Sequence, residues 1–154
     1  MQGSSGGRKT CPRVKDSTVN YLLDAGPLVA LLSETDMYHE WARSVLTVLD
    51  EPLYTTEAVV TEASHLLRKL RPALQVITLM VQGRRLRLVP TLSDDAERIG
   101  QMLQKYPQMD MADATLVALS ERYPRAKLIT IDRTDFTVYR RKDGKAVPPI
   151  MPPE

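Results

Sequence analysis

Four carboxylate residues stand where a metal ion bound by oxygen ligands would need them in this 154-residue chain. Asp24 follows the mainly apolar run 19–23, and Asp132 follows the apolar run 128–131. Glu62 and Asp113 stand among apolar neighbours in helical segments between those two runs. Several carboxylates gathered in a dry crevice repel one another and have raised pKa values. Because a divalent cation relieves that repulsion, the four acids indicate metal-dependent chemistry.

Three further polar residues accompany these acids. Asp110 begins the helical segment that contains Asp113, while Thr130 and Asp135 stand on either side of Asp132. We expect one of Asp132 and Asp135 to bind metal and the other to hold a metal-bound water or to cap a turn. Thr130 is placed to donate a hydrogen bond to a ligating carboxylate or to a phosphate.

Each acid also has an ordinary structural interpretation. Asp24 can cap a helix or form an Asx-turn, and Asp110 suits the N-cap position of a helix. Glu62 lies beside an apolar stripe, where it can extend to the boundary or pair with an arginine such as Arg68. Asp132 can be an ordinary loop carboxylate. No single position decides between the two interpretations, and the four acids together favour the metal site.

A ligand set made only of oxygen selects Mg²⁺ or Mn²⁺ over zinc. The natural reaction is attack of metal-activated water on a phosphodiester. Other kinds of site fit poorly, because the chain has neither a glycine-rich phosphate loop nor a nucleophile elbow. Gly26 stands where an aspartyl-phosphate hydrolase would carry a second Asp. His39 and His65 are interpreted as surface or boundary residues.

The segments that position the acids alternate between strand and helix. Apolar runs predict strands at 19–23, 53–55, 86–89 and 128–131, with a weak fifth strand at 136–139 or 147–150. Helical spacing predicts helices at 28–32, 37–49, 57–70, 72–82, 94–105 and 112–122. This alternation implies an α/β fold with a parallel sheet covered by helices on both faces. Right-handed crossovers then bring Asp24 and Asp132 to the carboxyl edge, where open α/β folds bind ligands.

Length and composition favour one domain between two tails. Hydrophobic residues make up 43% and charged residues 26%, as in ordinary globular proteins. Residues 1–17 predict a flexible basic N-terminal tail, residues 18–150 the domain, and residues 151–154 a C-terminal tail. Cys11 is the only cysteine, which excludes an internal disulfide. With no signal-peptide pattern and no apolar run of about 18 residues, we expect a cytoplasmic protein without a membrane partner.

Basic residues gather in three clusters, although the formal net charge is only +2. A cationic rim around an acidic pocket would suit a polyanion drawn past a metal site. Solvated helix ends and loops are the equally weighted alternative for each cluster. The clusters are Arg68, Lys69 and Arg71; Arg84, Arg85 and Arg87; and Arg140, Arg141 and Lys142.

Residues from about 21 to 136 resemble the PIN domain family, metal-dependent ribonucleases that include VapC-type toxins. The resemblance implies a three-layer α/β/α sandwich with a parallel sheet of four or five strands. It also implies Asp24, Glu62, Asp113 and Asp132 as catalytic and metal-binding residues, with Mg²⁺ or Mn²⁺ as the cofactor. The matching pieces are Leu23-Asp24, Thr61-Glu62, Asp110-Met111-Ala112-Asp113-Ala114 and Thr130-Ile131-Asp132-Arg133-Thr134-Asp135-Phe136.

The resemblance further implies RNA as the substrate, a homodimer and, for toxin members, an antitoxin protein as partner. We therefore expect a metal-dependent endoribonuclease, the toxin of a toxin–antitoxin pair. Ala25 stands where the family often has Ser or Thr, and the basic segment before the first strand is longer than many toxins have. Two alternatives stay open: a catalytically inactive PIN-like module that binds RNA or protein, and a metal-dependent DNA nuclease or phosphatase.

Overall fold

A single parallel sheet forms the centre of the molecule. The computed structural model describes residues 18–154, and the predicted N-terminal tail, residues 1–17, lies outside the described residues. The strand order is β3-β2-β1-β4-β5, and every neighbouring pair is parallel. The strands are β1 (Tyr21–Leu23), β2 (Leu53–Thr55), β3 (Leu86–Leu88), β4 (Lys127–Ile129) and β5 (Pro149–Ile150).

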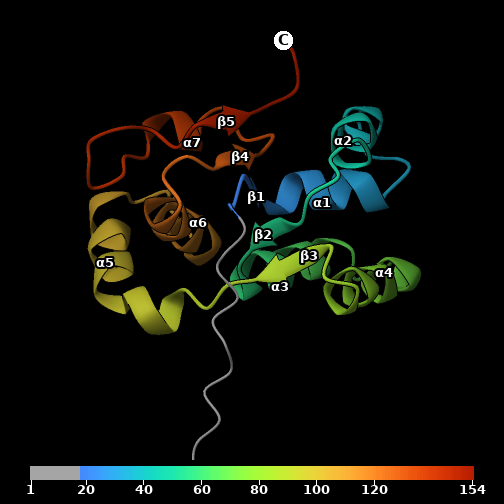
Figure 1. The fold of residues 1–154 in the computed structure, drawn as a ribbon, viewed down its shortest axis with the longest axis horizontal. Coiled ribbons are helices and arrows are strands. Elements are labelled where there is room, and N and C mark those ends of the chain that lie inside the picture. The colour runs from blue at the N-terminus through green and yellow to red at the C-terminus, as the bar shows by residue number, and fades with distance from the viewer. Residues whose placement is uncertain (1–17) are drawn as a thin grey trace, which may run out of the picture.

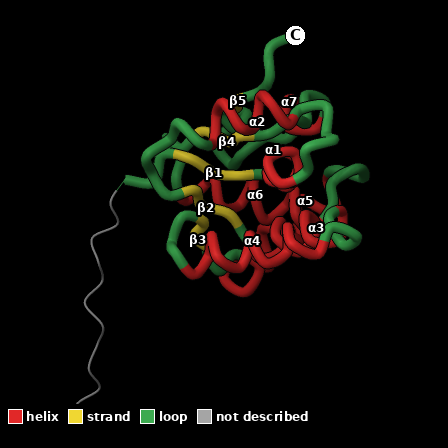
Figure 2. Tube along the Cα trace, turned by 90° about the vertical axis from the view of Figure 1, so that its right-hand side faces the viewer, coloured by secondary structure: helices red, strands yellow, loops and turns green. Residues whose placement is uncertain are grey.

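Helices cover both faces of this sheet. Figure 1 shows α5 and α6 together on one side of the strands and α1 and α2 on the other. The tube view from the side shows the same sheet enclosed by helices (Figure 2). Within residues 18–154 no helix is long and apolar enough to cross a membrane. The helices are α1 (Ala25–Leu32), α2 (His39–Leu46), α3 (Glu57–Leu66), α4 (Arg71–Gln82), α5 (Leu92–Lys105), α6 (Met111–Arg122) and α7 (Asp135–Val138).

The predicted α/β sandwich with a parallel sheet is therefore confirmed. The fifth strand is β5, which lies within the 147–150 alternative. The other alternative, 136–139, is wrong because residues 135–138 form α7. Asp132 Oδ1 accepts hydrogen bonds from the backbone N–H groups of Thr134 and Asp135, which start a helical turn in place of a strand.

Two helices end earlier than their apolar spacing predicts. α2 ends at Leu46 and α3 at Leu66, whereas the apolar pattern continues to Leu49 and Leu70. Leu70, between the two helices, has the non-helical dihedrals φ −106° and ψ 75°, and Pro72 suits the first turn of α4 because its missing N–H costs nothing there. The chain therefore turns between α3 and α4, and the leftover apolar side chains pack or stay exposed outside a helix.

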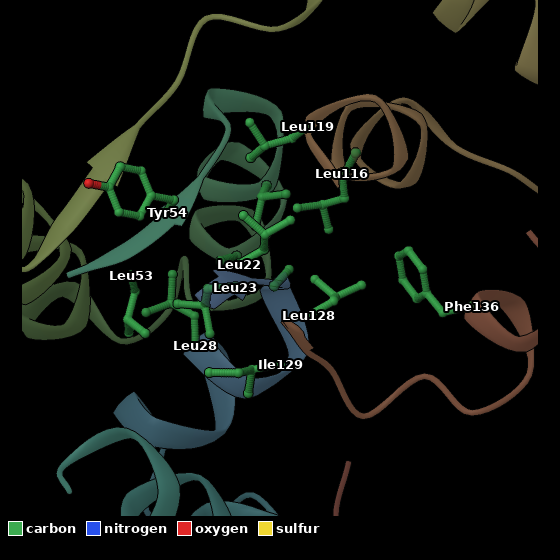
Figure 3. Packing of buried hydrophobic residues seen from close by; sticks show 14 of the residues in the cluster. Leu22, Leu23, Leu28, Leu53, Tyr54, Leu116, Leu119, Leu128, Ile129 and Phe136 are labelled. Atoms are coloured by element: carbon green, nitrogen blue, oxygen red, sulfur yellow. The ribbon is translucent and has the colours of Figure 1, made fainter. Parts of the chain in front are cut away.

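The core follows from the alternation of side chains along the central strands. Leu22 of β1 lies opposite Leu128 of β4, and Leu23 lies opposite Ile129. Figure 3 shows the first pair on the side of Leu116 in α6 and the second pair on the side of α1. All of these leucines and Ile129 are fully buried. Strands covered on both faces read as continuous apolar runs, which is why they are visible in the sequence.

The C-terminal residues 151–154 follow β5, and the end of the chain leads away from the domain (Figure 1). Pro152 in this predicted tail is buried, and its carbonyl oxygen accepts a hydrogen bond from the guanidinium of Arg133. The chain at Pro152 is thereby attached to the loop that follows β4.

We expect Leu128→Ala to lower the free energy of unfolding by about 2–5 kcal/mol, because it opens a cavity in a filled core. Leu79→Ala makes the same chemical change in α4 at a side chain that is 62% exposed, and we expect a change within about 0.5 kcal/mol. Urea unfolding of both variants measures the contrast. Similar losses in the two variants would contradict the position of Leu128 in the core.

Candidate active site

The parallel pairing of β1 with β4 places two of the predicted acids at one edge of the sheet. Asp24 directly follows β1, and Asp132 stands three residues after the end of β4. The backbone N–H of Asp24 donates to the carbonyl oxygen of Ile129 at 3.0 Å, which continues the ladder beyond the strands. Both acids therefore lie at the carboxyl edge, as the strand order requires.

Asp24 is both a helix cap and a buried acid. Its Oδ1 accepts a 2.7 Å hydrogen bond from the N–H of Ala25, the first residue of α1. Its Oδ2 accepts a 2.7 Å hydrogen bond from the hydroxyl of Thr130. Burial raises the pKa of Asp24 to about 6, and the charges of Asp132 and Asp110 add to this effect, while the two hydrogen bonds oppose it. The capping role found here does not remove the cost of burying the charge.

Thr130 connects the two strand-end acids. While its hydroxyl donates to Asp24, its oxygen accepts a 3.0 Å hydrogen bond from the backbone N–H of Asp132. The side chain is fully buried. One hydroxyl thus fixes the direction of the Asp24 carboxylate and the start of the loop that carries Asp132.

Asp113 enters the edge from the first turn of α6. Asp110 caps this helix, with its Oδ1 accepting a 2.8 Å hydrogen bond from the N–H of Asp113. Asp113 Oδ2 accepts a 2.9 Å hydrogen bond from the hydroxyl of Tyr139. The pKa of Asp113 is raised to about 7, mainly by burial and then by the charges of Asp110 and Asp24, against the lowering effect of the Tyr139 hydrogen bond.

Glu62 is half-buried on α3 and has no hydrogen-bond or ion-pair partner within residues 18–154. The alternative pairing with Arg68 is not found there, because the Arg68 guanidinium donates to the carbonyl oxygen of His65. Burial raises the pKa of Glu62 to about 7, with further contributions from the charges of Asp110, Asp24 and Asp132. Glu62 is therefore an acid whose surroundings hold other acids and no cation.

Asp132 and Asp135 lie at the start of α7, with Asp132 before the helix and Asp135 as its first residue. Asp132 Oδ1 accepts hydrogen bonds from Thr134 N–H at 3.1 Å and from Asp135 N–H at 2.9 Å. Asp132 thus caps the turn through one carboxylate oxygen, Oδ1. The pKa of Asp135 is raised, first by burial and then by the charge and hydrogen bond of Asp132.

The acids come from four different elements and act on one another electrostatically. Among residues 18–154, however, no three His, Cys, Asp or Glu side chains lie close enough together to hold a metal ion as they stand. The donor type fits a hard cation, because carboxylate oxygens are the groups involved. A positive charge near Asp24, Glu62 or Asp113 would oppose the rise in their pKa values.

Three of the nine residues in the basic clusters, Arg85, Arg87 and Arg141, are not exposed and are bound within the fold. The guanidinium of Arg85 donates to the carbonyl oxygens of Leu46, at 2.6 Å, and of Glu51. Arg141 is buried and donates to the carbonyl oxygen of Pro124 at 2.9 Å. Exposed basic side chains remain at Arg68, Lys69, Arg71, Arg84, Arg140 and Lys142.

Sequence reasoning did not find Tyr139. The apolar pattern makes its segment, 136–139, one alternative for the weak fifth strand, and no motif marks a tyrosine seven residues after Asp132 as a partner of Asp113. The usable signal is physical: a buried tyrosine hydroxyl needs a hydrogen-bond partner.

An α/β sandwich with a parallel sheet, and with acids after β1, on α3, on α6 and in the loop after β4, belongs to the class of open α/β domains that bind ligands at the carboxyl edge of the sheet. Within that class, the chain belongs to the PIN domain family, whose model matches residues 21–142. The family model thus covers the sheet from β1 to β4 and every acid described above.

Two solved structures share this fold. VapC20 of Mycobacterium tuberculosis, described as a sarcin–ricin loop cleaving toxin, is 17% identical with a TM-score of 0.63, covering 71% of this chain and 87% of its own. A toxin–antitoxin complex from Klebsiella pneumoniae is 20% identical with a TM-score of 0.60, covering 77% of this chain and 92% of its own. No protein with a curated description matches the sequence.

The raised pKa values predict how stability depends on pH without added metal. Asp24, Glu62 and Asp113 have folded-state pKa values of about 6, about 7 and about 7, above the ordinary values near 4. The folded protein therefore binds more protons than the unfolded chain between these limits. The contribution of these three acids to the free energy of unfolding is fully present at about pH 4 and is lost as pH rises through about 7.

Urea unfolding in EDTA between about pH 5 and pH 7.5 measures this effect, and Asp113→Asn is the informative variant. Because the variant has no carboxyl at this position, we expect its stability to decline less steeply with pH than that of the wild type. Parallel pH profiles would contradict the raised pKa of Asp113.

Proposed function

We propose that the protein is a Mg²⁺- or Mn²⁺-dependent endoribonuclease that hydrolyses RNA phosphodiesters, and the toxin of a toxin–antitoxin pair. The observation that carries this proposal is Glu62. It is a half-buried carboxylate without a partner in the described residues, and acids from three other segments raise its pKa. An uncompensated acid among acids destabilises the fold, and a divalent cation removes that cost.

The residues proposed to hold the metal are Asp24, Glu62, Asp113 and Asp132, with Asp110, Asp135 and Thr130 in support. Bound there, the cation would activate water and stabilise charge on the phosphate. The protein's own part is to hold the carboxylates in place. Thr130 orients Asp24, and the cap of α6 fixes the backbone of Asp113. The acids alone would repel the RNA phosphate, so substrate entry depends on the neutralised edge.

The toxin role and the partners are supported by the family and the neighbouring structures. One neighbour is a toxin–antitoxin complex, which supports an antitoxin protein as partner. VapC20 is described as cleaving the sarcin–ricin loop, so an RNA hairpin of that kind is a sensible first substrate. We further propose a cytoplasmic homodimer, which sedimentation can test directly.

The inactive-module alternative depends on Ala25, which lacks a hydroxyl next to Asp24. The structure weakens that argument, because a hydroxyl reaches the same carboxylate from Thr130 on the neighbouring chain segment. RNA that stays bound in EDTA, with no product in any metal, would favour the inactive module. Preference for DNA or for a phosphate monoester in a substrate panel would favour the other alternative.

We expect Asp24→Asn to lower RNA cleavage in Mg²⁺ or Mn²⁺ by about 100-fold or more, because one charged group at the reaction centre is lost. Asp50→Asn makes the same change at an exposed acid and should keep wild-type activity. Cleavage of a labelled RNA hairpin measures both. Equal activity of Asp24→Asn and the wild type would refute the role of Asp24.

Removing the Thr130 hydroxyl should impair the site less than removing an acid. We expect Thr130→Val to reduce cleavage by about 10-fold, because partners of metal ligands contribute on this scale. Thr130→Ser keeps the hydroxyl and should retain most of the activity. A Val variant as active as the Ser variant would show that the hydrogen bond to Asp24 is dispensable.

A further inference from the structure

Tyr139 directs a buried hydroxyl at one of the candidate metal ligands. Its side chain is fully buried, and its hydroxyl donates to Asp113 Oδ2 at 2.9 Å. A hydrogen bond to a carboxylate is shorter and stronger than one between neutral groups. Within the described residues, Asp113 Oδ1 has no hydrogen-bond partner. The phenol therefore occupies one carboxylate oxygen and leaves the other available.

The ring of Tyr139 is fixed by aromatic neighbours. Tyr106 contacts it edge-on with ring centroids 5.2 Å apart, and Phe136 does so at 5.5 Å. The backbone N–H of Tyr139 donates to the carbonyl oxygen of Asp135 at 3.0 Å, which closes α7. The hydroxyl is thus presented to Asp113 from a side chain with little freedom to move.

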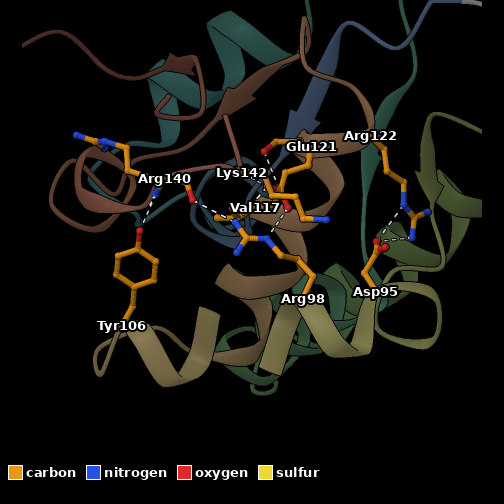
Figure 4. A network of polar contacts seen from close by, with 9 residues as sticks. Asp95, Arg98, Tyr106, Val117, Glu121, Arg122, Arg140 and Lys142 are labelled. Carbon is orange, nitrogen blue, oxygen red and sulfur yellow. Dashed lines mark hydrogen bonds and ion pairs between the residues drawn. The ribbon is translucent and has the colours of Figure 1, made fainter. Parts of the chain in front are cut away.

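The segment that follows Tyr139 is attached to α5 and α6 by a polar network (Figure 4). The backbone N–H of Arg140 donates to the hydroxyl of Tyr106 at 3.1 Å. Glu121 of α6 pairs with Arg98 of α5 at 2.9 Å and also accepts from the backbone N–H of Lys142. These contacts hold the chain that follows α7 against α5 and α6.

The short helix α7 also joins two of the acids. It begins where Asp132 Oδ1 accepts the N–H groups of Thr134 and Asp135, and its last turn ends at Tyr139, which binds Asp113. A change in the placement of α7 would therefore move both carboxylates. The helix therefore links Asp132, in the loop after β4, to Asp113 on α6.

We propose that Tyr139 is a positioning residue. Its hydroxyl, together with its place at the end of α7, holds the Asp113 carboxylate in the orientation that a divalent cation requires. The inference rests on the proposed metal site. Since Tyr139 is fully buried, it acts through Asp113 and does not touch the substrate. Partners of metal ligands set metal affinity by orienting the ligand atoms.

The test is Mn²⁺ binding to the purified protein, followed by the loss of the free Mn²⁺ signal in electron paramagnetic resonance. Tyr139→Phe keeps the ring and its aromatic contacts and removes only the hydroxyl. We expect it to weaken Mn²⁺ binding by about 10-fold. Tyr54→Phe is the matched control, because Tyr54 is also buried and its hydroxyl accepts from Arg87 and not from an acid of the site.

A double-mutant cycle separates action through Asp113 from general damage. In an Asp113→Asn background, Tyr139→Phe should cause no further loss of Mn²⁺ affinity, whereas a loss as large as in the wild-type background would overturn the proposal. Wild-type affinity in the single Tyr139→Phe variant would also overturn it.

The same titration distinguishes this inference from the proposed function. If the wild-type protein binds no Mn²⁺, both the inference on Tyr139 and the proposed function are wrong. If Mn²⁺ binding depends on Tyr139 and Asp113 but the protein cleaves no RNA, only the ribonuclease proposal is wrong. Thermal melting of Tyr139→Phe and Tyr54→Phe verifies that both variants are folded.

Discussion

Mutual repulsion among carboxylates is the constraint around which the carboxyl edge of this protein is built. Asp24, Glu62 and Asp113 are removed from water to different degrees, and the charge of Asp110 and of at least one further acid also raises the pKa of each. The fold accepts this cost at one place while its core is filled with leucine, isoleucine and alanine. Such a local conflict with stability is expected where a protein performs chemistry.

Hydroxyl groups are the means by which the fold holds these acids apart and in place. Thr130 reaches Asp24 from beyond β4, and Tyr139 reaches Asp113 from the end of α7. In each case the donor binds one oxygen of the carboxylate. A neutral donor stabilises an acid without cancelling its charge, whereas a lysine or arginine would occupy the position of the cation. Such neutral partners suit the proposed metal site, because they leave the negative charge of the carboxylate in place.

The acids and the main strands could be predicted because their signals are local. An apolar run that ends in Asp marks both β1 and β4, and Glu62 is conspicuous within an apolar stripe. The position of α7 could not be predicted in this way, since it depends on the side chain of Asp132 capping the following turn. The same holds for the partner of Asp113, because Tyr139 meets it only through packing between α6 and α7.

The basic clusters were the least informative feature of the sequence, because the contacts of their side chains also form only in the fold. In the sequence, Arg85 and Arg141 resemble surface residues. In the fold, their guanidinium groups donate hydrogen bonds to the backbone carbonyl oxygens of Leu46 and Pro124. An arginine that closes a loop and one that meets a phosphate have the same local sequence. Only the three-dimensional placement of carbonyl groups separates them.

The outermost strand has a consequence for how the molecule behaves at high concentration. β5 is only two residues long, and one of these is Pro149, which has no N–H group to offer. An incoming strand from another molecule would find almost no free donors on that side, so the sheet cannot easily grow there. The short, proline-bearing border therefore protects an otherwise strongly apolar sheet against edge-to-edge aggregation.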